Sequence, residues 1–229
     1  MILDVPRFRD RADAGRQLAA ALIGFAAADP LVLALPRGGV PVGFEVAKAL
    51  RAGLDVLLVR KIGAPGDPEY GIGAVVDGEN PQLVLNEEAM ALVQPSDDYV
   101  EAEKRRQLLE IERRRNLYLG SRPAAPVLGR TVIVVDDGIA TGGTVRVALK
   151  ALRKDRAGHV VLAVPVAPRE TLDLINPDVD EVVCLATPEP FVAVGRYYEN
   201  FEQTTDTEVV RLLQQAERFE NKSSMQSAG

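Results

Sequence analysis

The chain of 229 residues carries a formal net charge of −6, with 47% hydrophobic and 26% charged residues. This is globular material with enough apolar residues for a core, and its length fits one generous domain or one domain with a subdomain. The acidic balance argues against nucleic acid as the main partner, because proteins that bind phosphate backbones are usually basic. One cysteine, Cys184, and one histidine, His159, exclude an internal disulfide and metal sites built from Cys or His clusters.

The sequence also carries no membrane or secretion signal that we can recognise. No apolar run reaches the roughly 18 residues that a membrane span requires. The opening segment, residues 1–22, contains early acids and lacks a continuous apolar stretch, unlike a secretory signal. We therefore expect a soluble, cytoplasmic protein.

Apolar periodicity predicts alternating helices and strands in the first part of the chain. Asp10 is a suitable N-cap for the first helix. Residues 61–73, KIGAPGDPEYGIG, are so rich in Gly and Pro that we expect a loop there. The expected elements are a helix over 10–28, a strand over 31–35, a helix over 42–51, a strand over 54–59, and a hairpin that joins 74–76 to 82–85.

Residues 97–119 predict a long, highly charged helix. Its glutamates alternate with its basic residues at helical spacing, which favours a solvated face with salt bridges over a nucleic-acid patch. A thin apolar stripe (Val100, Leu108, Ile111 and Tyr118) predicts packing on the body of the protein or on a second subunit. The remaining expected elements are strands over 131–135, 160–166 and 179–185, helices over 143–155, 168–175 and 205–219, and a disordered tail over 221–229.

Near-continuous apolar strands that alternate with helices are typical of an α/β fold, a parallel twisted sheet with helices on both faces. In such sheets the loops at the carboxyl ends of the strands form the ligand crevice. The loops that follow Leu35, Val59 and Val135 are therefore the candidate functional segments.

The third of these loops, in the segment TVIVVDDGIATGGT over residues 131–144, combines two kinds of group. Asp136 and Asp137 end a buried strand, where carboxylates can hold ribose hydroxyls or a hydrated divalent cation. Residues 141–144 bring backbone N–H groups and two hydroxyls to a helix N-terminus, which favours a phosphate. Together they predict a sugar-phosphate site.

Other interpretations of this segment fit less well. A receiver-type phosphorelay domain needs more chain after its acidic pocket, and a haloacid-dehalogenase-type motif needs Asp-x-Asp on a first strand. A Walker A loop is absent. A plain turn between strand and helix stays open, although it leaves the two acids and two threonines around the glycines unexplained.

With these loops in order, the chain resembles the type I phosphoribosyltransferases, whose motif for phosphoribosyl pyrophosphate (PRPP) is an apolar strand, two acids and T-G-x-T. The resemblance implies that Asp136 and Asp137 hold the ribose hydroxyls and that the T-G-x-T turn holds the 5′-phosphate. It covers about residues 30–200. The residues it assigns to PRPP binding in this loop are Asp136, Asp137, Gly138, Ile139, Ala140, Thr141, Gly142, Gly143 and Thr144.

The first two loops fit the same family. Residues 36–40, PRGGV, resemble its pyrophosphate loop: Gly38 and Gly39 let the backbone approach a diphosphate, and Arg37 offers a charged fork. An ordinary tight turn with a surface arginine remains the alternative. Residues 60–73 resemble the family's flexible lid, in which Lys61 would reach the pyrophosphate leaving group, and lid closure would exclude water.

The acceptor is less well defined by the sequence. The segment PEPFVAVGRYYENF resembles the hood of purine-type members, which implies base contacts from Phe191, Val192, Tyr197, Tyr198 and Phe201, although these aromatic residues could equally pack a small terminal subdomain. Members that act on 6-oxopurines carry an acid immediately before T-G. Ala140 occupies that position here, so the loop is closer to the adenine-type pattern, whose catalytic Glu has its nearest counterpart in Asp77. The acceptor need not be a nucleobase.

The resemblance implies a single domain over residues 1–220. Its core would span 30–85 and 127–185, its hood 1–28 and 186–204, and an extra helical insertion 86–126. We expect a Mg²⁺-dependent, homodimeric enzyme in which Arg37, Lys61, Asp136, Asp137 and Asp77 are catalytic and Mg²⁺ is held mainly by PRPP, with Asp136 and Asp137 as candidate ligands. A PRPP- or nucleotide-sensing protein on the same fold is the alternative.

Overall fold

The computed structural model describes residues 8–226, with side chains described as far as Glu217. Its centre is a five-stranded sheet in the order β2-β1-β6-β7-β8, in which every neighbouring pair is parallel. The expected parallel α/β fold is confirmed. The strands are β1 (Leu31–Ala34), β2 (Gly53–Val56), β6 (Thr131–Val135), β7 (His159–Val166) and β8 (Glu181–Ala186).

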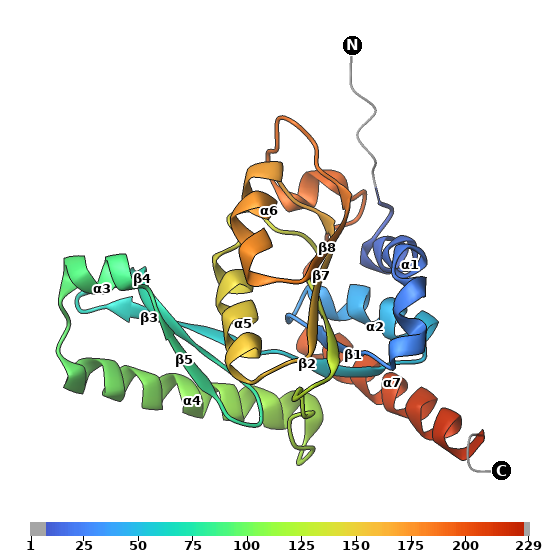
Figure 1. Cartoon of the computed structure of the whole chain (residues 1–229), viewed down its shortest axis with the longest axis horizontal. Coiled ribbons are helices and arrows are strands. Elements are labelled where there is room, and N and C mark those ends of the chain that lie inside the picture. Colours follow the sequence, from blue (N-terminus) through green and yellow to red (C-terminus); the bar gives the residue numbers. More distant parts are fainter. Residues whose placement is uncertain (1–7, 227–229) are drawn as a thin grey trace.

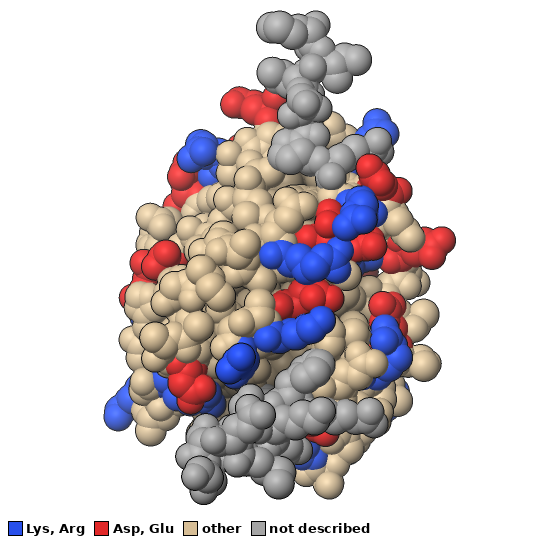
Figure 2. Space-filling view, turned by 90° about the vertical axis from the view of Figure 1, so that its right-hand side faces the viewer, with Lys and Arg blue, Asp and Glu red and all other residues tan. Residues whose placement is uncertain are grey.

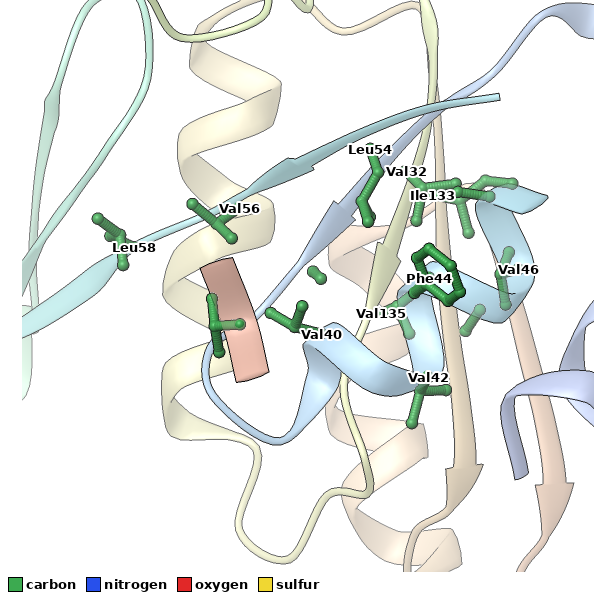
Figure 3. Packing of buried hydrophobic residues seen from close by; sticks show 14 of the residues in the cluster. Val32, Val40, Val42, Phe44, Val46, Leu54, Val56, Leu58, Ile133 and Val135 are labelled. Carbon is green, nitrogen blue, oxygen red and sulfur yellow. The ribbon is translucent and has the colours of Figure 1, made fainter. Parts of the chain in front are cut away.

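Both faces of this sheet are covered, which explains why its strands are almost continuously apolar. Helices α1 (Arg11–Ala21), α2 (Gly39–Leu50) and α7 (Asp206–Gln226) lie on one face, and α5 (Gly143–Lys154) and α6 (Arg169–Ile175) lie on the other (Figure 1). Val32 and Ile133, from adjacent strands, point toward Phe44 of α2 and are fully buried (Figure 3).

A second, antiparallel sheet in the order β3-β4-β5 extends away from the main sheet beside a long helix (Figure 1). The expected loop over 61–73 is therefore wrong, because these residues form most of the hairpin between β3 and β4. A side-chain carbon at Gly63 would lie 2.5 Å from the carbonyl oxygen of Pro68, so the glycine serves a close approach of two backbones. The elements of this arm are β3 (Val59–Ala64), β4 (Asp67–Val76), β5 (Gln82–Leu85), α3 (Glu87–Val93) and α4 (Asp97–Leu119).

The arm and the main sheet share one core. Ile62 and Ile72 of the hairpin and Ile111 and Tyr118 of α4 are buried in the same cluster as Leu213 of α7. Three 3₁₀ helices complete the described fold: η1 (Ile23–Ala28), η2 (Asn176–Asp178) and η3 (Val194–Tyr197).

Several element bounds differ from expectation. The strand expected over 54–59 is divided between β2 and β3, and α2 begins three residues early because Gly39 already has helical geometry. The helix α3 was not expected, and α7 continues through Gln226 into the segment expected to be a disordered tail, whose last residues, 227–229, lie outside the described part. None of the described helices combines the length and apolar character needed to cross a membrane.

Candidate functional site

The first and third loops meet at the carboxyl ends of two adjacent strands. Strand β1 pairs in parallel with β6, and the amide of Leu35 donates to the carbonyl of Val135 at 2.9 Å. A side-chain carbon at Gly38 would overlap the carboxylate of Asp137, and one at Gly39 would lie 2.6 Å from the Val135 carbonyl oxygen. Two glycines are therefore required for the loop over 36–40 to lie against the acids.

The two aspartates differ in environment. Oδ1 of Asp136 accepts a hydrogen bond from the amide of Asp137 at 2.8 Å. Burial, and then the neighbouring charge of Asp137, raise the pKa of Asp136 well above its usual range. Asp136 and Asp137 thus place two carboxyl groups side by side just after β6, against the loop over 36–40.

The turn between Asp137 and α5 is anchored at Ile139 and open beyond it. Ile139 is buried, and its amide donates to the Val166 carbonyl at 3.0 Å. Gly142, the N-cap of α5, has φ +73°, and a side chain there would meet Ile175 and Thr171 at 2.9 Å. The exposed residues at the helix start are Thr141, Gly143 and Thr144. An exposed helix N-terminus with hydroxyls beside it suits a phosphate group.

The two predicted cations flank these loops. Nη1 of Arg37 lies 3.8 Å from Oδ1 of Asp206 at the start of α7, and the Arg37 side chain is 34% exposed. The peptide bond before Arg37 is cis. Lys61, on β3, is exposed and lines a cavity of about 550 Å³ together with Gly143 and Thr144. The structure therefore brings Lys61 to the same cavity as the start of α5.

One residue at the site was missed by the sequence analysis. Nε of Arg11, at the start of α1, donates to Oδ2 of Asp137 at 2.7 Å, and the two side chains are only 11% and 15% exposed. The hydroxyl of Tyr198 donates to the backbone carbonyl of Asp137 at 2.5 Å. Arg11 and Asp137 are 126 positions apart, and nothing local in the sequence marks the pairing.

Comparison with known proteins agrees with this arrangement of loops. Residues 7–200 match the family described as phosphoribosyl transferase domain. The chain belongs to this family. The resemblance seen in the PRPP motif is thereby confirmed.

The relatives of this chain include curated proteins and a solved structure. Proteins from two strains of Mycobacterium tuberculosis, CDC 1551 / Oshkosh and H37Rv, are each 48% identical over 211 residues, or 92% of the chain, and their assigned name, phosphoribosyl transferase, is itself provisional. The chain spans about half, 47%, of the length of these relatives. The crystal structure of TT1426 from Thermus thermophilus is 44% identical, with a TM-score of 0.80 over 91% of this chain and 98% of that one.

Asp77 lies apart from the loop over 36–40 and from Asp136 and Asp137. It is 6% exposed at the end of β4, and its carboxylate accepts from Nη1 of Arg115 at 2.5 Å. Nη2 of the same arginine binds Asp55 at 2.9 Å. The structure places Asp77 in a buried ion-pair cluster beneath α4 and not beside Asp136 and Asp137, and its catalytic role stays a prediction.

The hood residues divide into buried and exposed members. Tyr197 and Tyr198 are 5% and 2% exposed, and they pack in a cluster around Phe8, so their rings offer no surface to a base. Phe191 is half-buried against Tyr197, with the ring centroids 5.4 Å apart. The exposed apolar members are Val192, at 67%, and Phe201, at 37%.

Proposed function

We propose that this protein transfers the phosphoribosyl group of PRPP to a nitrogen atom of an acceptor and releases pyrophosphate. The observation that carries the proposal is the convergence of the glycine loop over 36–40 on Asp136 and Asp137, beside an exposed helix N-terminus. A diphosphate loop, two acids for ribose and a phosphate turn occur together there. PRPP carries the three groups that these segments would bind: a diphosphate, a ribose and a 5′-phosphate.

Each segment of the proposed site binds a different part of PRPP. The turn over residues 141–144 holds the 5′-phosphate, and Asp136 and Asp137 hold the ribose hydroxyls. The acceptor nitrogen forms its bond to the anomeric carbon as the carbon–oxygen bond to pyrophosphate breaks, with inversion and without a protein nucleophile. Arg37 and Lys61 stabilise the charge that gathers on the departing diphosphate, and positioning by the loops supplies much of the rest.

We infer that Mg²⁺ serves this reaction, held mainly by PRPP itself. Within residues 8–226 no cluster of three or more His, Cys, Asp or Glu side chains forms a dedicated metal cage. Asp136 and Asp137 fit the donor set that Mg²⁺ prefers, one or two carboxylates with substrate phosphates and waters. When bound, the ion would neutralise charge on the diphosphate.

We propose a purine base of the adenine type as the acceptor. Ala140 occupies the position where 6-oxopurine members carry an acid, and its carbonyl accepts from the Thr171 hydroxyl at 2.7 Å. The exposed Val192 and Phe201 supply the apolar surface that a planar heterocycle needs. The buried tyrosines of the hood support this surface from below.

We further propose that the protein acts in the cytoplasm, in nucleotide salvage, as a homodimer. Leu109 and Leu117 of α4 are 67% and 46% exposed, and their burial against a second copy of the chain would favour self-association. On the face that forms the right-hand side of Figure 1, acidic and basic side chains are interspersed beside a broad uncharged area (Figure 2). Light scattering on purified protein measures the assembly directly.

The proposed reaction is tested by binding and turnover in parallel. Titration calorimetry with PRPP and Mg²⁺ should show binding, and pyrophosphate release should appear with adenine or another base in an acceptor screen. The double substitution Asp136→Asn/Asp137→Asn should abolish PRPP binding with the fold intact. Asp173→Asn, an exposed acid on α6, is the matched control and should bind PRPP normally.

Each outcome separates two interpretations. PRPP binding by the double variant at wild-type affinity would show that the acids are not the ribose site. Binding by the wild type without pyrophosphate release for any acceptor would favour a PRPP sensor over an enzyme.

A further inference from the structure

Arg11 joins the hood to the acid pair. Its guanidinium holds Oδ2 of Asp137 through Nε at 2.7 Å, while Nη1 donates to the carbonyl of Glu202 at 2.6 Å. Its Cζ lies 3.9 Å from the centroid of the Phe201 ring, which is a cation–π distance. One side chain therefore contacts both the PRPP loop and the exposed aromatic residue of the hood.

The segments that Arg11 bridges are themselves tied together. The amide of Phe8 donates to the Tyr197 carbonyl, and the amide of Glu199 donates to the Phe8 carbonyl, both at 2.8 Å. The amide of Asn200 donates to the carbonyl of Arg9 at 2.9 Å. The start of α1 and the segment over 197–202 therefore form one unit, and a displacement of either is transmitted to Arg11.

Asp137 is fixed by this unit from two sides. Arg11 binds its carboxylate, and the Tyr198 hydroxyl binds its backbone carbonyl. The same carboxylate fills the space that a side chain at Gly38 would need, so it also packs against the loop over 36–40. With Oδ2 held by Arg11, Oδ1 is the carboxylate oxygen left to meet a ribose hydroxyl.

We propose that Arg11 is a positioning residue that sets the Asp137 carboxylate for ribose and couples donor binding to the state of the hood at Phe201. This inference rests on the proposed function, because it assigns the ribose of PRPP to Asp137. The guanidinium suits the task because it donates in a fixed plane and stacks on an aromatic ring at the same time, which an ammonium cannot reproduce. A ligand that orders Phe201 would hold Arg11 in place and so strengthen PRPP binding. PRPP would in turn strengthen the binding of that ligand by the same factor.

The test measures PRPP affinity in a double-substitution cycle. Arg11→Met should weaken PRPP binding roughly tenfold, the scale of one charge-assisted hydrogen bond. Phe201→Leu should weaken it roughly threefold, because it loosens Arg11 without touching the donor site. In the Arg11→Met background, Phe201→Leu should have no further effect on PRPP affinity.

Two further variants separate positioning from simple stability. Arg16→Met removes an arginine of the same helix that pairs with Asp13 and Glu45, and it should leave PRPP affinity unchanged. Arg11→Lys keeps the charge but not the planar fork, and should recover part of the affinity lost in Arg11→Met. Melting temperatures of all variants, measured without ligand, identify any that fail to fold.

The outcomes distinguish this inference from the proposed function. Wild-type protein that does not bind PRPP would overturn the proposed function and this inference with it. If a folded Arg11→Met variant binds PRPP as tightly as the wild type does, this inference is overturned and the proposed function is not. Multiplicative effects of Arg11→Met and Phe201→Leu would show that the hood acts independently of Arg11 and would overturn the coupling.

Discussion

At the scale of single residues, the buried charges beneath α4 and those of the acid pair have different counter-ions. Asp55 and Asp77 share Arg115, and Asp55 also faces Arg122 at 3.5 Å. Burial raises the pKa of Asp77 even though Arg115 lowers it, because one guanidinium is divided between two carboxylates. We expect a buried ion-pair cluster of this kind to support the structure and not the reaction.

The substitution Asp77→Asn tests this distinction. The pKa of Asp77 is higher in the folded protein than in the unfolded chain, so the protonated carboxyl stabilises the fold at pH values below the usual Asp pKa. This stabilisation is lost as the pH rises through the raised pKa. As the pH rises from about 4 to about 7, the melting temperature of the variant should therefore fall less than that of the wild type. Scanning fluorimetry across pH measures this.

Pyrophosphate release provides the second measurement for the same variant. Activity should stay near wild type, because Asp77 lies outside the proposed site and Arg115 keeps Asp55 as a partner. A folded variant with no turnover would restore the catalytic role that the sequence suggested for Asp77.

Residues of the site were predictable where they lie together in the sequence. Asp136, Asp137 and the turn over 141–144 form one contiguous motif whose chemistry is evident from residue type alone. Arg11 was not predictable, because an arginine in the first turn of a helix has many possible partners. The roles of Tyr197 and Tyr198 depended on tertiary burial, which a row of aromatic residues does not reveal.

At the scale of elements, α4 anchors the β3–β4 hairpin. The Tyr99 hydroxyl donates to the carbonyl of Gly63 at 2.9 Å, and Nε of Arg60 donates to Gln107 at 3.1 Å. Arg115 adds the ion pair to Asp77 at the far end of β4. The helical insertion expected over 86–126 thus supports the hairpin along its length.

The substitution Arg115→Met should strongly weaken the contact between α4 and the β3–β4 hairpin, and with it the stability of the protein. It leaves Asp55 and Asp77 buried near each other without their shared cation, and removal of one partner of a buried ion pair costs about 3–5 kcal/mol. Urea unfolding should show a lower midpoint. Arg113→Met, which breaks an exposed pair with Glu110, is the control and should leave the midpoint close to that of the wild type.

A small effect of Arg115→Met, similar to that of the control, would show that water reaches the two acids and that the cluster contributes little. The helix α4 itself was predicted with its observed bounds, because its charge spacing is a local signal. The hairpin was missed because glycine and proline were taken as signs of a loop, whereas here the glycines allow two strands to approach closely.

At the scale of the whole molecule, the main sheet and the arm are parts of one cooperative core. Ile62 and Ile72 are fully buried in the cluster that also contains Val32 and Ile133 of the main sheet. The alternation of strands and helices sufficed to predict the main sheet. It could not predict that a second sheet would share the core, because that depends on contacts between distant segments.

Hydrogen exchange tests this shared core. Amides in the paired parts of β3 and β4 should be protected to nearly the same free energy as those of β1 and β6, because all of them open with the same core. The exposed tip over 65–70 should exchange fast. Fast exchange along the full length of both strands would show instead that the hairpin opens by itself, as a mobile lid does.

The overlap between the space at Gly38 and the Asp137 carboxylate also limits how this sequence can diverge. A larger residue at 38 requires a shorter one at 137, and a shorter one at 137 removes the carboxylate. Each first step is therefore harmful, and no path of single neutral changes leads away from the pair. In a library randomised at both positions, folded clones should include several combinations, while clones selected for PRPP binding should return to Gly38 with Asp137.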